Sequence, residues 1–186
     1  MESTQETPPR RWIEVAVARQ TCTFWQDGSP QISWPVSTAA RGTGFAEGSL
    51  RTPTGRFRIA AKIGAGAEPG TVFKGRRPVG HWSPESRDFG PDDDLITSRI
   101  LTLDGLEPAN ANTLERYVYF HGTNHEDKIG RPASHGCIRL RNDDMIALFD
   151  LVETGDLVLV HESADSRRFF APPSDCTLQS DGNPPS

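Results

Sequence analysis

The chain has 186 residues, of which 35% are hydrophobic and 24% are charged, and its formal net charge at pH 7 is −5. A chain of this length can bury the core of one domain without disulfide staples, and a negative net charge argues against a nucleic-acid-binding surface. The longest apolar runs, such as VAVA at 15–18, are far too short to span a membrane. We therefore expect a globular domain that binds neither nucleic acid nor membrane.

The two ends of the chain differ from its middle. Residues 1–10 and 164–186 are poor in large apolar side chains and rich in Pro, Ser and Asp, so we expect disordered ends around a domain at 11–163. The start MESTQETPPRRW lacks the apolar segment of a secretory signal. Three cysteines leave at least one thiol unpaired, as in a reducing compartment. We expect a cytoplasmic protein, or a periplasmic one if an export signal has been trimmed from the chain.

Short runs rich in β-branched and aromatic residues, separated by Gly and Pro, predict strands along the domain. In chain order these runs are RWIEVAVA (11–18), TCTFW (21–25), QISWPV (31–36), GRFRIAAKI (55–63), SRILTL (98–103), RYVYFHG (116–122) and DLVLVH (156–161). The polar segments 74–94 and 104–115 are expected to be long loops, either surface excursions or a lid over a groove. We predict a mainly β domain.

One helix is predicted after residue 141. Asn142 is a candidate N-cap, and Asp143 and Asp144 suit the positive end of the helix dipole. Gly155 offers a left-handed stop. Apolar residues follow at helical spacing on the face expected to enter the core, namely Met145, Leu148, Phe149 and Val152. The segment RPASHGCIRLRN (131–142) therefore lies on the loop between a strand and this helix.

That segment and YFHGTNH (119–125) bring one cysteine and three histidines close together in the sequence. A thiolate is a nucleophile, and a neighbouring imidazole can act as its base or its ion-pair partner. His121 ends a predicted strand, so we expect it to be the base for Cys137. His135 lies two residues before the cysteine and is expected to support it. The backbone N–H groups of His135, Gly136 and Cys137 are the candidate oxyanion donors.

The same residues allow a second interpretation, in which His121, His125, His135 and Cys137 bind zinc. Helical HxxxH geometry is disfavoured because Gly122 and Asn124 separate the first two histidines. We therefore prefer catalysis and expect neither a metal nor another cofactor.

Three motifs resemble those of the L,D-transpeptidase catalytic-domain family. They are HGT from His121, SHGC from Ser134 to Cys137, and TPTG at 52–55, and the resemblance extends over residues 12–161. It implies a sandwich-like, mainly β fold with a helix after the cysteine loop. One difference is Arg139, because many members have Asn two residues after the cysteine.

The resemblance also implies a substrate, a partner and a reaction. The substrate is the stem peptide of peptidoglycan or a muropeptide, cut between the L-centre of its diamino acid and D-alanine. Cys137 attacks the carbonyl, His121 takes the thiol proton, and a thioester forms. The resemblance also implies that carbapenems acylate this cysteine. His135 tunes the thiol, and Gly122, Ser134 and Arg139 are expected to contact the substrate, with Arg139 a candidate for binding a stem carboxylate.

The acceptor of the acyl group is not specified by these motifs. We expect water, which makes the protein a cytoplasmic L,D-carboxypeptidase in murein recycling. The alternatives are an amine acceptor, as in cross-linking or modification of peptidoglycan, and a non-catalytic peptidoglycan-binding module or zinc protein.

Overall fold

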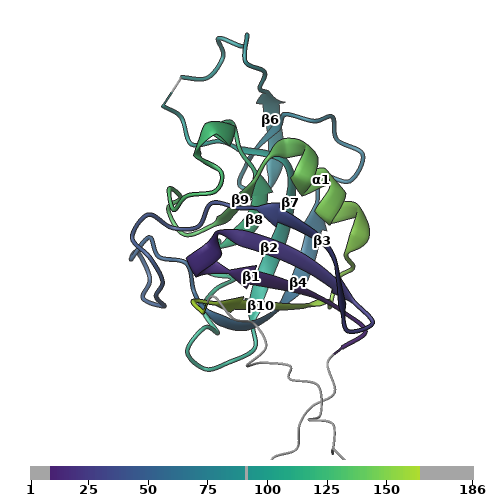
Figure 1. Cartoon of the computed structure of the whole chain (residues 1–186). Helices are drawn as coiled ribbons and strands as arrows, with labels where there is room; N and C mark the ends of the chain where they lie inside the picture. The colour runs from purple at the N-terminus through teal and green to yellow at the C-terminus, as the bar shows by residue number, and fades with distance from the viewer. Residues whose placement is uncertain (1–8, 91, 164–186) are drawn as a thin grey trace, which may run out of the picture.

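The computed structural model describes residues 9–90 and 92–163, and within these ranges the chain forms ten strands and one α-helix (Figure 1). The elements are β1 (Arg11–Ala16), β2 (Thr21–Gln26), β3 (Ser29–Pro35), β4 (Gly55–Ile63), β5 (Thr71–Lys74), β6 (Arg77–His81), β7 (Ile96–Gly105), β8 (Tyr119–Gly122), β9 (Ile138–Leu140), α1 (Asn142–Leu151) and β10 (Leu157–His161), with short 3-10 helices at Val17–Arg19 and Glu126–Lys128. The prediction of a mainly β domain with a helix after the cysteine segment is confirmed.

The strands form one sheet that curls on itself. Its main path is β3-β2-β1-β10-β4-β7-β5-β6, and β8 pairs with both β7 and β9. Directly after β3, Ser37 bridges Arg139 of β9 through two backbone hydrogen bonds of 2.9 Å. This bridge joins distant parts of the sheet, so β1–β3 lie in front of β7 and β8, as Figure 1 shows. The result is the expected sandwich-like arrangement around one core.

Alternating apolar residues of these strands fill the space between the two halves of the sheet. The main cluster includes Ile13, Phe57, Leu101 and Phe120, and α1 closes it with Met145, Leu148 and Phe149. Burying one such side chain contributes about 1.5–3 kcal/mol to folding. A smaller cluster of Phe73, Ile100 and Tyr119 packs against the half-buried Cys137. The cysteine side chain therefore rests on buried apolar residues.

The predicted ends of the helix are wrong at both sides. Asn142 is the first helical residue, and the N-cap position belongs to Arg141. The Asn142 side chain instead accepts a hydrogen bond from the Thr97 hydroxyl at 2.6 Å and donates to the Thr123 carbonyl at 3.0 Å. Tertiary partners therefore replaced the local cap. The helix ends at Leu151, and Gly155 (φ 94°) lies in the following turn.

Three strands lie where none was predicted. β5 and β6 form a hairpin that reaches into the segment 74–94, and β9 follows Cys137 directly. β6 is exposed along its whole length and β9 has only three residues, so neither has the apolar alternation that identifies a strand.

Residue 10, which lies just before the predicted boundary at residue 11, contacts the turn between β1 and β2. The Arg10 carbonyl accepts a hydrogen bond from the Asp27 backbone at 2.8 Å, and the Arg10 side chain pairs with the Asp27 carboxylate. Residue 10 is thus part of the β1–β2 hairpin. The rest of the prediction for the termini, at 1–8 and 164–186, lies outside the described residues.

Candidate active site

Parallel pairing of β8 with β9 brings the two sequence motifs together. His121 pairs with Arg139 in the register of these strands. Cys137 lies two residues before Arg139, so its side chain is on the same face of the sheet. A pocket of about 120 Å³ is lined by Asp94, Ile96, His121, His135, Cys137 and Arg139. The predicted nucleophile and both predicted imidazoles therefore line one small pocket.

The Cys137 thiol is held by backbone groups of the chain that leads into β8. Its sulfur donates to the Tyr117 carbonyl and accepts from the Tyr119 N–H, each at 3.4 Å. Burial raises the pKa of this thiol to about 11, although the Tyr119 N–H and the Arg139 charge both act in the opposite direction. At neutral pH the group is a thiol, and it needs a base when it attacks.

His121 is buried, with 3% of its surface exposed. Its Nδ1 lies 2.7 Å from the Gly122 carbonyl oxygen, and because that oxygen can only accept, Nδ1 carries the hydrogen and Nε2 keeps a lone pair. Burial lowers the pKa of His121 to about 4, so the imidazole is neutral at pH 7. In the described part of the chain, no hydrogen bond joins it to Cys137.

The protonation state of Cys137 leads to a prediction for alkylation. A raised thiol pKa lowers the thiolate fraction, so labelling of Cys137 by iodoacetamide should accelerate about tenfold per pH unit from pH 6 to pH 9. The measurement is peptide mapping of Cys137 labelling against time. A plateau that begins near pH 6 would mean that the resting site is a thiolate–imidazolium pair, which contradicts this account.

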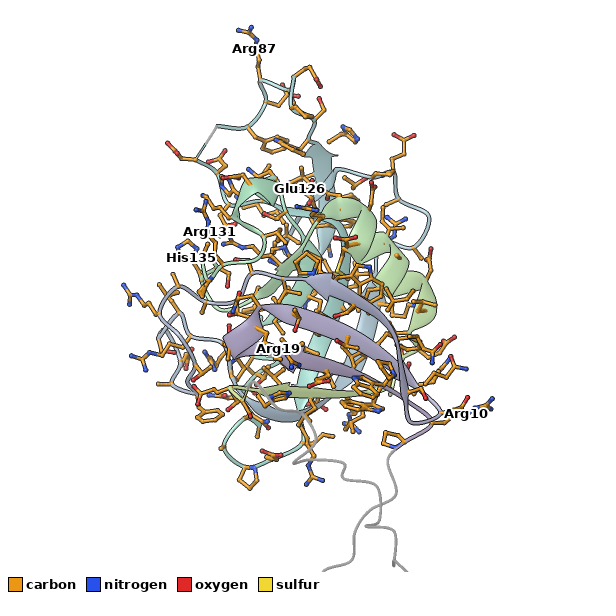
Figure 2. The ribbon with its side chains drawn as sticks, viewed as in Figure 1. Arg10, Arg19, Arg87, Glu126, Arg131 and His135 are labelled. Carbon is orange, nitrogen blue, oxygen red and sulfur yellow. The ribbon has the colours of Figure 1, made fainter. Side chains whose placement is uncertain are left out.

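The acidic residue at the pocket, Asp94, was missed at the sequence level. Its Oδ2 accepts a hydrogen bond from His135 Nδ1 at 2.9 Å and another from the Arg139 guanidinium. The His135 side chain is 66% exposed, and Figure 2 shows it at the surface on the same side as Arg131. Asp94 lies in the acidic run DDD (92–94) of a segment predicted to be a loop, and nothing in that run distinguishes one carboxylate from the others.

Arg139 lines the pocket but is not open to a ligand in the way the sequence suggested. Only 2% of its surface is exposed, and its guanidinium is already paired with Asp94. Burial lowers the pKa of Arg139, and the Asp94 charge opposes that shift. The geometry therefore favours an internal ion pair over bidentate binding of a stem carboxylate.

Of the three N–H groups expected to bind the oxyanion, one is already hydrogen-bonded within the protein. The Gly136 N–H donates to Ser134 Oγ at 3.2 Å, so it is not available to a substrate. No acceptor lies on the N–H groups of His135 and Cys137 within the described ranges. Gly136 itself has φ 130°, a conformation that favours glycine, and the hydroxyl of Thr52 in the TPTG motif donates to its carbonyl at 2.9 Å.

Two of the residues expected to contact substrate have a structural position instead. Ser134 is buried, and its hydroxyl donates to the Cys137 carbonyl at 2.6 Å, which closes the cysteine loop. Gly122 is buried beneath Asn142 and Thr97. Neither presents a free group to the pocket, so the prediction of substrate contact by Ser134 and Gly122 is not supported by their positions.

The tight packing around Gly122 leads to a stability prediction. A Cβ at this position would lie 2.6 Å from Asn142 Oδ1 and 2.7 Å from the Thr97 carbonyl oxygen. Gly122→Ala should therefore lower the free energy of unfolding by about 1–3 kcal/mol in urea titrations. Gly90→Ala is the matched control, because its Cβ would meet only ordinary contacts of 3.4 Å or more, and an equal effect of both substitutions would refute the packing argument.

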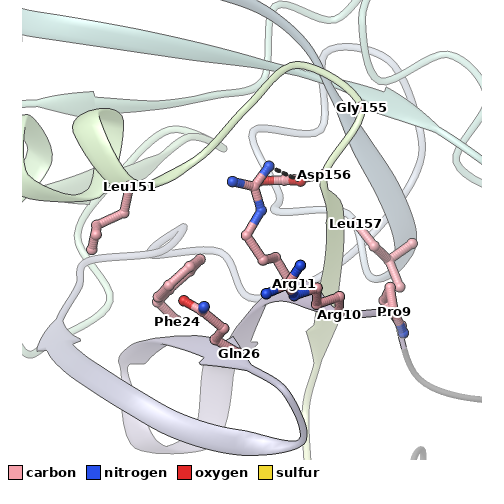
Figure 3. Close-up of a pocket in the computed structure, with 9 residues that line it drawn as sticks. All are labelled: Pro9, Arg10, Arg11, Phe24, Gln26, Leu151, Gly155, Asp156 and Leu157. Atoms are coloured by element: carbon pink, nitrogen blue, oxygen red, sulfur yellow. Dashed lines mark hydrogen bonds and ion pairs between the residues drawn. The ribbon is translucent and has the colours of Figure 1, made fainter.

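Two larger pockets lie elsewhere. One of about 630 Å³, which Figure 3 shows, is lined by residues around the Arg11–Asp156 ion pair and contains no thiol or imidazole. Another of about 600 Å³ is lined by Trp82, Phe89 and His125 among others. His125 thus belongs to a different pocket from Cys137, which separates the four ligands of the zinc alternative. Among the described residues, no group of three or more His, Cys, Asp or Glu is arranged for a metal ion.

Across residues 9–90 and 92–163, no helix has both the length and the apolar character needed to cross a bilayer.

The sequence of the domain is similar to those of known proteins. A family model described as the L,D-transpeptidase catalytic domain (YkuD) matches residues 10–160. A Bacillus subtilis (strain 168) protein named putative L,D-transpeptidase YqjB is 43% identical over 118 residues, which cover 63% of this chain and 55% of the relative. The probable L,D-transpeptidase YbiS of Escherichia coli (strain K12) is 38% identical over 68 residues, or 37% of this chain and 19% of the relative. The chain thus spans about half the length of the first of these relatives and less of the second.

Solved structures show the same fold. An L,D-transpeptidase from Mycobacterium smegmatis has a TM-score of 0.53 at 22% identity, with 82% of this chain and 58% of that chain covered. L,D-transpeptidase 3 from Mycobacterium tuberculosis, in complex with a faropenem-derived adduct, has a TM-score of 0.53 at 19% identity, with 84% of this chain and 62% of that chain covered.

Proposed function

Since the chain belongs to the L,D-transpeptidase catalytic-domain family, we propose that it is a cysteine acyl-transfer enzyme acting on the stem peptide of peptidoglycan. The family match over residues 10–160 confirms the resemblance seen in the HGT and SHGC motifs. The names of the relatives support peptide acyl transfer as the reaction. The bond cleaved joins the L-centre of the diamino acid to the following D-alanine.

The first half of the reaction forms a thioester. The Cys137 sulfur attacks the carbonyl carbon of the L-centre while the thiol proton moves to His121 Nε2. The N–H groups of His135 and Cys137 stabilise the oxyanion, and one such donor is typically worth about 2.7–4 kcal/mol. The proton then passes from His121 to the leaving amine, the C–N bond breaks, and D-alanine departs.

The observation that carries this proposal is the shared pocket of Cys137 and His121. The sulfur lies above a packed apolar floor, and the neutral imidazole keeps its lone pair on Nε2 because Nδ1 donates to the Gly122 carbonyl. Because the thiol and the imidazole are both neutral at rest, the proton moves to His121 during the attack rather than before it.

In the second half of the reaction, water takes the acyl group, so the enzyme acts as an L,D-carboxypeptidase. The pocket supports this acceptor because it opens to solvent at His135, whose side chain is 66% exposed, so water can reach the thioester. Trimming of soluble muropeptides in the cytoplasm is the setting that fits hydrolysis. Recovery of the protein from the periplasmic fraction of cells would contradict that location.

A second candidate is transfer to an amine. The relatives carry the name L,D-transpeptidase, which favours an amine acceptor in the same thioester chemistry. Both reactions share the Cys137 acyl-enzyme and differ only in the group that attacks it.

Product analysis on a defined tetrapeptide stem separates these reactions. The chain is incubated with the stem, with and without a D-amino acid such as D-methionine, and products are quantified by liquid chromatography and mass spectrometry. A dominant tripeptide product supports hydrolysis, and a dominant exchanged tetrapeptide supports transfer to an amine. If neither forms, acyl transfer is refuted and a binding module is favoured.

A further inference from the structure

A single carboxylate joins two charged or titratable side chains at the Cys137 pocket. Asp94 Oδ2 is the shared acceptor of His135 Nδ1 and the Arg139 guanidinium, and all three residues line the pocket. None of these contacts involves His121, which is held by a backbone carbonyl. The pocket therefore contains two imidazoles that are oriented by different partners.

The backbone on both sides of Asp94 is fixed. The Asn124 side chain donates to the Asp93 carbonyl at 2.7 Å and accepts from the Leu95 N–H at 3.0 Å. Ile96 then begins β7. Asp94 thus lies in a segment that is hydrogen-bonded on both sides and leads directly into β7. We expect its carboxylate to keep the same position when substrate binds.

The hydrogen bond to Asp94 sets the tautomer of the His135 imidazole. Because a carboxylate oxygen only accepts, Nδ1 of His135 carries the hydrogen and Nε2 retains a lone pair. His121 has the same tautomer but is buried, whereas the His135 side chain is 66% exposed. The incoming acceptor must arrive from solvent, and His135 is the imidazole on the open side of the pocket.

We propose that Asp94 is a positioning residue that holds His135 as the general base for the acceptor, so that each half-reaction has its own imidazole. This inference rests on the proposed function. The acceptor water gives its proton to His135 Nε2 as its oxygen bonds to the thioester carbon. The C–S bond then breaks, and the proton returns to the sulfur through solvent, which restores the thiol and the free imidazole.

The buried Arg139 explains why a carboxylate is needed at this point and how it should be tested. Among the described residues, Asp94 is the acidic partner of the buried Arg139 guanidinium, and loss of its charge destabilises the fold. Asp94→Asn also loses that charge, but it keeps an oxygen acceptor and the side-chain volume, so it is preferred to alanine. His135→Gln changes an exposed side chain and leaves the Arg139–Asp94 pair in place.

The test separates the two half-reactions with a tetrapeptide stem and rapid acid quenching. Release of D-alanine in the first turnover reports acylation, and release of free tripeptide reports deacylation. His135→Gln should slow tripeptide release by about 10²-fold and Asp94→Asn by at least about tenfold, while the first equivalent of D-alanine appears within about fivefold of the wild-type rate. Asp93→Asn, which makes the same charge change one residue earlier, should match the wild type in both steps.

The deacylation rate of the double variant Asp94→Asn/His135→Gln distinguishes positioning of His135 from a purely structural role of Asp94. If Asp94 acts through His135, the double variant deacylates no more slowly than His135→Gln alone. Multiplied losses, equal slowing of both half-reactions, or wild-type deacylation in His135→Gln would each overturn the proposal. A wild-type chain that forms no acyl-enzyme would instead refute the proposed function itself, and this inference with it.

Discussion

We expect Cys137→Ala to abolish turnover of the tetrapeptide stem, with a loss of roughly 10⁴-fold or more. The substitution removes the sulfur that forms the thioester, and among the described residues Cys137 is the thiol that lines the pocket. Folding should be retained because the hydrogen bonds of the sulfur within the described residues are two long ones, each at 3.4 Å, to backbone groups. The measurement is the steady-state rate of D-alanine release together with the urea midpoint of unfolding.

The matched control is Cys22→Ala. Cys22 is fully buried in the main core, and burial raises the pKa of its thiol further than that of Cys137. This variant should lose stability without losing the chemical step, since Cys22 does not line the pocket. Measurable cleavage by Cys137→Ala would mean that another group is the nucleophile.

We expect His121→Gln to slow acylation by about 10²–10⁴-fold, which is the usual size of general-base catalysis. Glutamine has a similar volume and can still donate to the Gly122 carbonyl, but its amide cannot accept the thiol proton at neutral pH. The first-turnover rate of D-alanine release measures this step directly. The loss is expected in acylation because, in the proposed mechanism, the buried His121 imidazole and not His135 accepts the thiol proton.

His125→Gln is the comparison for that experiment. His125 lines the pocket with Trp82 and Phe89 and is absent from the pocket of Cys137. It should acylate at the wild-type rate. A loss below about tenfold in His121→Gln would transfer the role of thiol base to another group, and His135 is the other imidazole that lines the pocket.

Local patterns predicted the long buried strands well. The run at 55–63 coincides with β4, and the run DLVLVH coincides with β10 apart from its first residue. These strands are marked by alternating or continuous apolar residues because each is paired on both sides in the sheet. The exposed β6 and the three-residue β9 have no such pattern and depend on their pairing partners.

Candidate site residues could be predicted from the sequence where a reactive side chain lies in a short motif. Cys137, His121 and His135 were predicted because thiols and imidazoles are rare side chains with specific chemistry, and two short motifs contain all three. The structure places the three around one pocket. Asp94 could not be identified, since it is 41 residues from His135 along the chain and its role depends on tertiary contacts. The same reason explains Asn142, which was expected to cap its own helix but bonds to Thr97 of β7.

The proposed site depends on one covalent event, the formation of a thioester between the Cys137 sulfur and the L-centre carbonyl of the stem. Its most direct measurement is mass spectrometry of the intact chain quenched with acid milliseconds after mixing with the tetrapeptide, followed by peptide mapping. We expect a mass increase equal to the stem acyl group without D-alanine, located on the peptide that contains Cys137. An unmodified Cys137 during active cleavage, or an adduct on another residue, would contradict the account.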